Sequence, residues 1–124
     1  MPDFITKEQL TAQEAYSRVQ VRQAQEKFAD YKSFALSFPS LIHSCGLVQA
    51  LSFAASKKKN AFIDDLQAVF DVIDNAGNLL NRSREAHILE YMRITRHAIS
   101  AASWIKRYCQ AVPDNINNNN QEGE

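Results

Sequence analysis

The most informative chemical pattern in this sequence is a set of basic residues spaced around its one tryptophan. At helical spacing along 93–107, one side carries Arg93, His97, Ser100, Trp104 and Arg107, with Arg96 nearby. Arginine beside an indole ring suits single-stranded nucleic acid, because the ring stacks on a base while the cations bind phosphates. The same residue types anchor protein interfaces, and an indole can also cover a second seam of a helical core. All three interpretations of Trp104 remain open from the sequence.

Two other basic groups are candidates for contact with an anionic partner. One is a row at helical spacing, which consists of Arg18, Arg22, Gln25 and Lys32. The row lies away from the apolar side of its helix, so it is expected to be exposed, either as a binding face or as a merely solvated one. The other group is Lys57-Lys58-Lys59. Lysines after a helix complement its C-terminal dipole, but three in a row exceed that need.

One pair of residues has the spacing of a catalytic site. Arg82 and His87 show an Arg-x4-His pattern that resembles small helical ribonucleases of the HEPN type, in which an Arg and a His act together on a phosphodiester. The pattern is short, and it straddles a predicted helix start. It gives the alternative enzymatic hypothesis, under which the purified protein degrades RNA and His87→Ala abolishes that activity.

Patterns typical of metal sites and nucleophiles support no other chemistry. A cation site or, more simply, a solvated acidic face could be formed by Asp64, Asp65, Asp71 and Asp74. His43 and Cys45 lack further ligands at zinc spacing. The sequence has no Gly-rich phosphate loop and no paired nucleophile and base. We therefore expect no metal, no cofactor and no catalytic activity.

Composition is that of a globular protein with one domain. The 124 residues are 45% hydrophobic, and 14 Lys and Arg balance 14 Asp and Glu. Acidic and basic residues are nevertheless segregated along the chain, so a basic face can exist despite the zero net charge. The two cysteines form no disulfide framework, and no apolar stretch has the length of a signal core or approaches the ~20 residues of a membrane span. We expect a cytoplasmic protein with reduced thiols and no membrane contact.

Helical periodicity accounts for almost all of the chain, and no segment has a convincing strand pattern. Four main helices are predicted, over 6–36, 39–56, 61–75 and 83–111. Thr6 with Gln9, and Thr11 with Glu14, each fit a capping box at the start of the first helix, and Asn60 and Ser83 would cap the third and fourth helices. Phe38-Pro39 separates the first two helices, because a residue before proline avoids the α region. The fold class is therefore all-α: a compact bundle of four main helices, with room for short extra helical turns.

Apolar stripes indicate which faces turn inward. The main stripe of the first helix is Val21, Ala24, Phe28, Tyr31, Ala35 and Phe38. A second, rotated stripe includes Tyr16 and Val19 and could pack on a partner. The inner face of the fourth helix is predicted as Ile88, Met92, Thr95, Ile99, Ala102 and Cys109. Residues 1–112 form one domain, and the polar, Asn-rich tail 113–124 is expected to be disordered because it cannot bury apolar surface.

Two sequence blocks resemble a known family, the small subunit of the type III-B CRISPR–Cas RNA-silencing complex, called the Cmr complex. The first block, FPSLIHSCGLVQALSFAASK, carries Phe38-Pro39, Leu41-Ile42, Gly46-Leu47, Gln49-Ala50-Leu51, Phe53 and Lys57. The second block, EYMRITRHAISAASWIKRYCQA, carries Tyr91, Arg93, Thr95, Arg96, Ala98, Trp104, Lys106, Arg107 and Ala111. The first is the more specific, since a glycine within a strongly helical pattern is uncommon.

The resemblance implies a non-catalytic scaffold in antiviral defence. Small subunits of that family stack beside the large Cas10-type subunit, the backbone subunits and further copies of themselves. They help line the channel that receives target RNA paired to guide RNA. Such a subunit would contact phosphates and leave sequence recognition to base pairing. A helical protein–protein adaptor without nucleic-acid contact is the alternative from a third class.

The basic groups and the resemblance together give the candidate site residues. Phosphate contacts are expected from Arg18, Arg22, Lys57, Lys58, Lys59, Arg93, Arg96 and Arg107. Contacts with other subunits are expected from Trp104, Tyr16 and Val19.

Overall fold

Six α-helices and the turns between them make up residues 5–113, the part of the chain that the computed structural model describes. They are α1 (Lys7–Gln23), α2 (Phe28–Cys45), α3 (Leu47–Ser56), α4 (Asn60–Ile73), α5 (Leu79–Glu85) and α6 (Ile88–Ala111). No strand occurs within this part, so the all-α class is confirmed. The predicted disordered tail lies, apart from Pro113, outside the described residues.

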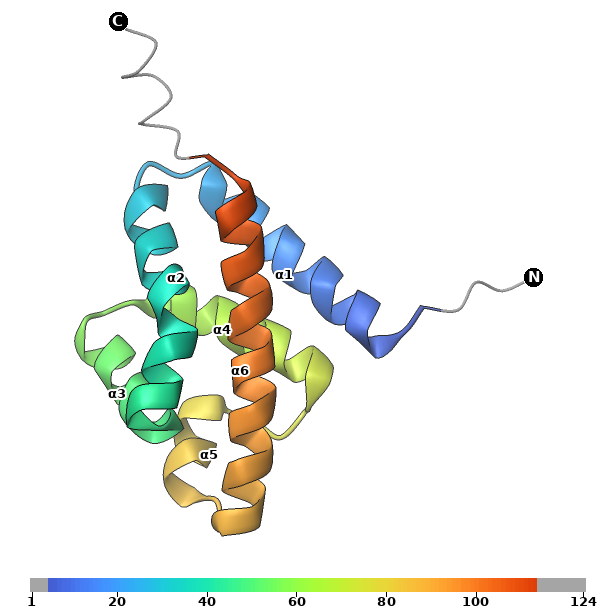
Figure 1. The fold of residues 1–124 in the computed structure, drawn as a ribbon, viewed down its shortest axis with the longest axis vertical. Helices are drawn as coiled ribbons and strands as arrows, with labels where there is room; N and C mark the ends of the chain where they lie inside the picture. The colour runs from blue at the N-terminus through green and yellow to red at the C-terminus, as the bar shows by residue number, and fades with distance from the viewer. Residues whose placement is uncertain (1–4, 114–124) are drawn as a thin grey trace, which may run out of the picture.

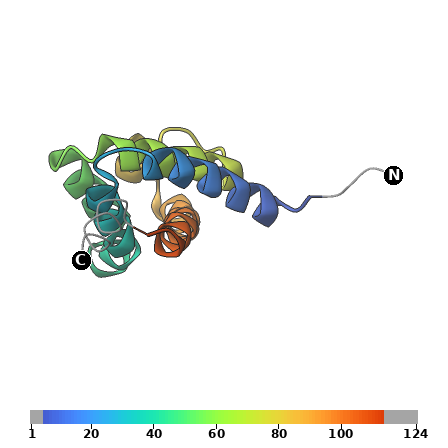
Figure 2. The same cartoon turned by 90° about the horizontal axis from the view of Figure 1, so that it is seen from above.

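The four longer helices form two layers, with α1 and α4 in one and α2 and α6 in the other (Figures 1 and 2). Both pairs are antiparallel. The Lys7 ammonium donates to the Ile73 carbonyl (3.5 Å), which places the start of α1 beside the end of α4. The Lys32 ammonium likewise donates to the Val112 carbonyl (2.8 Å), which places the start of α2 beside the end of α6. The core lies between the layers and is closed by α3 and α5.

The predicted first helix is two helices. Its start is confirmed: the Thr6 side chain accepts from the Gln9 backbone, and the Gln9 side chain accepts from the Thr6 backbone. The chain then leaves the helix at 24–27 and begins α2 at Phe28, so the prediction of one helix to residue 36 was wrong. The break swings α2 into the second layer. It also ends the predicted stripe, because Val21 is 57% exposed while Phe28 is buried.

The boundary predicted at Phe38-Pro39 was also wrong. Pro39 lies inside α2, where its ring nitrogen cannot donate to the carbonyl one turn earlier. Phe38 and Pro39 are both buried, and their packing offsets that loss. The chain turns instead at Gly46, whose φ of +88° is costly for residues with a Cβ. Gly46 therefore separates α2 from α3 rather than lying within one helix.

The second half of the chain agrees better with its periodicity. Helix α4 begins at Asn60, one residue before the prediction, with Lys59 and not Asn60 at the N-cap. Ser83 does not cap the last helix. It lies buried in α5, where its hydroxyl donates to the Leu80 carbonyl (2.7 Å). The N-cap of α6 is His87, and the helix ends at Ala111, as predicted.

The inner face of α6 differs from the predicted one. The side chains that are buried are those of Ile94, Ala98, Ala101, Ala102, Ile105 and Cys109. Ile88 and Met92, which were expected inside, are 68% and 50% exposed. Ala102 and Cys109 were predicted correctly, whereas the buried Ala98 and Ala101 were not in the predicted face. Small side chains let α1 and α2 approach α6 closely.

Candidate nucleic-acid interface

The eight basic residues that are expected to contact phosphate do not share one surface. Arg18 and Arg22 lie on α1 against α4, and the three lysines occupy the turn between α3 and α4. The remaining three lie along α6 and are Arg93, Arg96 and Arg107. The structure therefore brings together only part of the predicted set: Arg22 shares a cavity with the three lysines.

A buried carboxylate binds the two arginines of α1. Arg22 donates to both oxygens of Asp65, from Nε to Oδ2 (2.8 Å) and from Nη2 to Oδ1 (3.1 Å). Arg18 donates to Oδ1 (3.4 Å), and the Tyr31 hydroxyl donates to Oδ2 (2.6 Å). Burial raises the pKa of Tyr31, which keeps the hydroxyl protonated as a donor.

Two expectations from the sequence are corrected here. Asp65 is 0% exposed, so it does not belong to a solvated acidic face. The predicted basic row is divided between α1, the turn at 24–27 and α2, and the Arg22 side chain is only 19% exposed, so the row is not one exposed face. Hydrogen bonding to Asp65 raises the pKa of Arg22 despite partial burial. The cluster ties α1, α2 and α4 together where the chain breaks at 24–27.

The three consecutive lysines, here called the basic turn (Lys57, Lys58 and Lys59), connect α3 to α4. The backbone N–H groups of Lys58 and Lys59 donate to the Ala55 and Ala54 carbonyls (both 3.0 Å), which completes the end of α3. Lys58 has a φ of +58°, the left-handed conformation that closes many helices. Within residues 5–113, no carboxylate lies within salt-bridge distance of these ammonium groups. Their charge is thus available to an outside anion.

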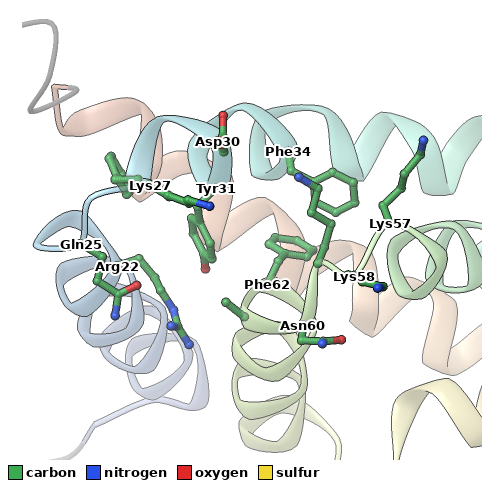
Figure 3. A pocket seen from close by; sticks show the side chains of 13 residues that line it. Arg22, Gln25, Lys27, Asp30, Tyr31, Phe34, Lys57, Lys58, Asn60 and Phe62 are labelled. Carbon is green, nitrogen blue, oxygen red and sulfur yellow. The ribbon is translucent and has the colours of Figure 1, made fainter.

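Aromatic rings lie directly beside the basic turn. The Lys57 ammonium lies over the Phe53 ring at 5.6 Å from its centroid, and that of Lys59 over the Phe34 ring at 5.5 Å. The basic turn, the start of α2 and the end of α1 surround a cavity of about 300 Å³, here called the aromatic–lysine cleft (Figure 3). Sequence reasoning missed these rings as site residues: Phe34 was in none of the predicted apolar stripes, and Phe53 was noted only in the first block of the family resemblance.

A second ion-pair cluster holds Arg93 on α6. Its Nε donates to Oδ2 of Asp74 (3.0 Å), and Nδ1 of His97 lies 2.8 Å from the same oxygen. Burial acts to raise the pKa of Asp74, but the hydrogen bonds from His97 and Arg93 outweigh it, and the pKa is lowered overall. Arg96 is exposed, as is Arg93 despite its ion pair. The positive charge on this side of α6 is therefore partly neutralised by Asp74, at the end of α4.

The residues expected to contact other subunits have different surroundings. Trp104 is half-buried at the edge of the core, where it stacks on Tyr108 with centroids 5.9 Å apart. Tyr16 meets Tyr108 edge-on and is 48% exposed. Val19 is 2% exposed and lies in the core of this chain, so its assignment to a subunit surface is withdrawn. Arg107 and Trp104 also line a cavity of about 370 Å³ between α1 and α6.

The alternative catalytic pair lies at the junction of α5 and α6. The Arg82 guanidinium contacts the carboxylates of Glu90 and Glu85, and His87 is exposed at the N-cap of α6. Among residues 5–113, no group of three or more acidic, His or Cys side chains is arranged to hold a metal ion. Over the same residues, no helix is long and apolar enough to span a bilayer.

Comparison with known proteins establishes the family. The chain matches the model of the family described as CRISPR-associated protein (Cas_Cmr5) over residues 7–112. The chain belongs to the Cmr5 family. This finding confirms the resemblance drawn from the two sequence blocks.

A curated sequence and a solved structure, both from Thermus thermophilus, show how far the similarity extends. The CRISPR system Cmr subunit Cmr5 is 38% identical over 110 residues, and the match covers 86% of this chain and 96% of that protein. A crystal structure of a CRISPR-associated Cmr5 family protein superposes with a TM-score of 0.76 at 35% identity. It covers 87% of this chain and 97% of the other. The match to the family model, over residues 7–112, includes every helix described above.

Proposed function

We propose that this Cmr5-family chain is a non-catalytic small subunit of a type III-B CRISPR effector complex. In this role it stacks with neighbouring subunits and helps line the channel that receives target RNA, inside the cell and as part of antiviral defence. Family membership supports the proposal that the chain is part of this complex, since a Cmr5 relative is named as a Cmr subunit. The RNA role is supported by the basic turn, whose three ammonium groups have no carboxylate partner within residues 5–113 and are therefore available to phosphates.

The ion pairs of the candidate phosphate ligands support a ranking among them. Lysine ammonium groups without a carboxylate partner can each replace a counterion on RNA. The three lysines of the basic turn meet that condition, and Arg96 and Arg107 are exposed on α6. Arg18, Arg22 and Arg93 would have to share their guanidinium groups with Asp65 or Asp74. We therefore assign the main phosphate contacts to the first set and positioning roles to the second.

The scaffold role rests on apolar side chains that the fold leaves uncovered. At the start of α6, Ile88, Leu89 and Met92 are 68%, 79% and 50% exposed. On α1, Leu10 and Tyr16 are 45% and 48% exposed. Apolar surface at two separate places suits a subunit with more than one neighbour. The neighbours in this proposal are the large Cas10-type subunit, the backbone subunits and further copies of the chain.

A ribonuclease role is less well supported by the geometry. The two carboxylates at Arg82 compete with a phosphodiester for its guanidinium. His87 is at a helix N-terminus, where a positive charge is disfavoured. The proposal therefore assigns cleavage to other subunits of the complex.

Charge reversal in the assembled complex tests the RNA role. Lys57→Glu with Lys58→Glu changes the net charge by about −4, because each substitution replaces a positive by a negative charge. Lys7→Glu with Arg84→Glu gives the same change away from the basic turn and is the matched control. We expect the first pair to weaken target-RNA binding roughly tenfold at moderate salt and the control to change it little. Equal affinities in complexes that contain equal amounts of the subunit would reject the role.

A further inference from the structure

The aromatic–lysine cleft combines two kinds of group that nothing in the fold requires to be together. Its lining includes the half-buried rings of Tyr31 and Phe34 and, at its rim, the basic turn (Figure 3). A volume of about 300 Å³ is at the small end of the ~300–1,000 Å³ of ligand sites. The cleft is therefore suited to a ligand the size of one nucleotide.

The rings form a continuous aromatic surface rather than isolated contacts. Phe34 stacks on Phe53 with centroids 6.4 Å apart and an interplanar angle of 16°, and it meets Phe62 edge-on at 5.3 Å. Phe62 is fully buried, so it holds Phe34 in place from below. Phe53 extends the surface beyond the cleft and is 42% exposed. Flat aromatic surfaces held rigidly in this way are what unpaired bases stack on.

The charge around the cleft favours an anionic ligand. Five basic residues line it: Arg22, Lys27, Lys57, Lys58 and Lys59. Asp30 is its one acidic lining residue among those described. Arg22 is bound to Asp65, but the basic turn has no such partner within residues 5–113. The ammonium groups of Lys57 and Lys59 lie over aromatic rings, and such contacts are weak at exposed sites, so a phosphate could replace them.

We propose that the aromatic–lysine cleft binds one unpaired nucleotide of single-stranded RNA, with its base against Phe34 and its phosphate on the basic turn. This inference rests on the proposed RNA role and goes beyond it. A channel that only contacts phosphates would bind paired and unpaired strands alike, whereas this cleft selects an unpaired base. Stacking tolerates every base, because each has a π-face, so the cleft would have little sequence preference.

A variant that fills the cleft without changing any charge tests the inference. Ala61 lines the cleft in the first turn of α4, and Ala61→Leu adds bulk there while it keeps every lysine and every ring. The assay is fluorescence anisotropy of the full chain with a labelled eight-nucleotide oligouridine and, in parallel, a blunt RNA duplex of equal length. We expect Ala61→Leu to weaken oligouridine binding about tenfold, with duplex binding and the salt slope unchanged.

The outcomes separate this inference from the broader proposal. If Ala61→Leu binds oligouridine as the wild type does while Lys57→Glu with Lys58→Glu weakens it, the cleft inference is wrong and the RNA role stands. If neither variant weakens binding, both are wrong. Equal weakening for duplex and single strand also overturns the inference.

An NMR titration of the wild-type chain gives a result that no variant's folding can affect. With oligouridine, the ring protons of Phe34 should shift upfield because a stacked base shields them. The indole N–H of Trp104 serves as the internal reference, because Trp104 lines a different cavity. Shifts at Trp104 without shifts at Phe34 would contradict the inference.

Discussion

The hydroxyl of Tyr91 in α6 accepts a hydrogen bond from the backbone N–H of Val48 in the first turn of α3, at 3.2 Å. A Cβ placed on Gly46 would lie 3.5 Å from the same hydroxyl oxygen. Gly46 and Tyr91 belong to the two sequence blocks that resemble the Cmr family. The two blocks therefore meet in one contact, between residues 43 positions apart, that supplies an acceptor for a helix start without a side-chain cap.

Gly46→Ala should destabilise the protein by about 1–2 kcal/mol, because alanine pays for a positive φ that glycine adopts freely. The space itself is sufficient, since 3.5 Å is an ordinary contact distance. Tyr91→Phe should cost about 1 kcal/mol by removing the acceptor for the Val48 N–H. Urea unfolding measures both. A neutral Gly46→Ala would mean that the turn between α2 and α3 differs from the one described.

Asp65 should be the most sensitive acidic position in α4. Asp65→Ala leaves Arg22 and Tyr31 without their shared acceptor, and removing one partner of a buried pair costs about 3 kcal/mol or more. The neighbouring Asp64→Ala, at an exposed position, is the matched control and should change the free energy of unfolding by less than about 0.5 kcal/mol. Thermal and urea unfolding distinguish the two. Similar losses for both variants would contradict the assignment.

Asp74 should contribute to stability in a way that depends on pH. Its pKa in the folded chain is lowered, since the hydrogen bonds from His97 and Arg93 outweigh the effect of burial. As the pH falls, the Asp74 carboxylate is therefore protonated in the unfolded chain first, at about pH 4. The contribution is present above that pH and is lost as the pH falls through the lower folded-state value.

Asp74→Asn tests this dependence. At neutral pH, the free energy of unfolding of the variant should be roughly 1–2 kcal/mol lower than that of the wild type. On acidification from about pH 5 to pH 3, the free energy of unfolding should fall less for the variant than for the wild type. Urea unfolding at several pH values gives both curves. Parallel curves, with a constant difference down to pH 3, would show that Asp74 does not titrate as described.

The two thiols should differ sharply in reactivity. Cys45 is exposed, whereas Cys109 is buried and burial raises its pKa to about 12. Because the thiolate is the reactive form, one thiol should react with a disulfide reagent in the native protein at pH 8 and two in denaturant. Cys45→Ala should leave none reactive in the native state. Two fast-reacting thiols in the native wild type would mean that the end of α6 is not packed as observed.

The sequence predicts the fold class well and the helix boundaries less well. Periodicity and the Thr6 cap locate the helices, because both are local signals. The break at 24–27 contains no glycine or proline. The break is stabilised by hydrogen bonds from Arg22 and Tyr31 to Asp65. Asp65 is 43 residues from Arg22 and 34 residues from Tyr31 in the sequence. Local rules also predict a boundary at Pro39, where burial in the core outweighs the lost hydrogen bond.

In the candidate site too, local sequence patterns could be predicted, whereas contacts between distant residues could not. Lys57, Lys58 and Lys59 were identified from the sequence, because three adjacent charges in a turn are a local pattern. The pairing of Arg22 with a buried carboxylate was not foreseen, since helical spacing shows which residues share a face and not what that face meets. Phe34 was missed for a related reason, because it lies outside the predicted apolar stripes. Its contacts with Phe53 of α3 and Phe62 of α4 join helices that are separate in sequence, so spacing along one helix does not reveal them.

Above all, we propose that this chain is a scaffold subunit of an RNA-guided complex. The most direct test is to co-purify it with the products of its neighbouring genes and to determine the mass and RNA content of the intact assembly. We expect to find the chain in a complex that carries guide RNA, in more than one copy. A chain that purifies alone, with its neighbours assembled around guide RNA without it, would contradict the claim.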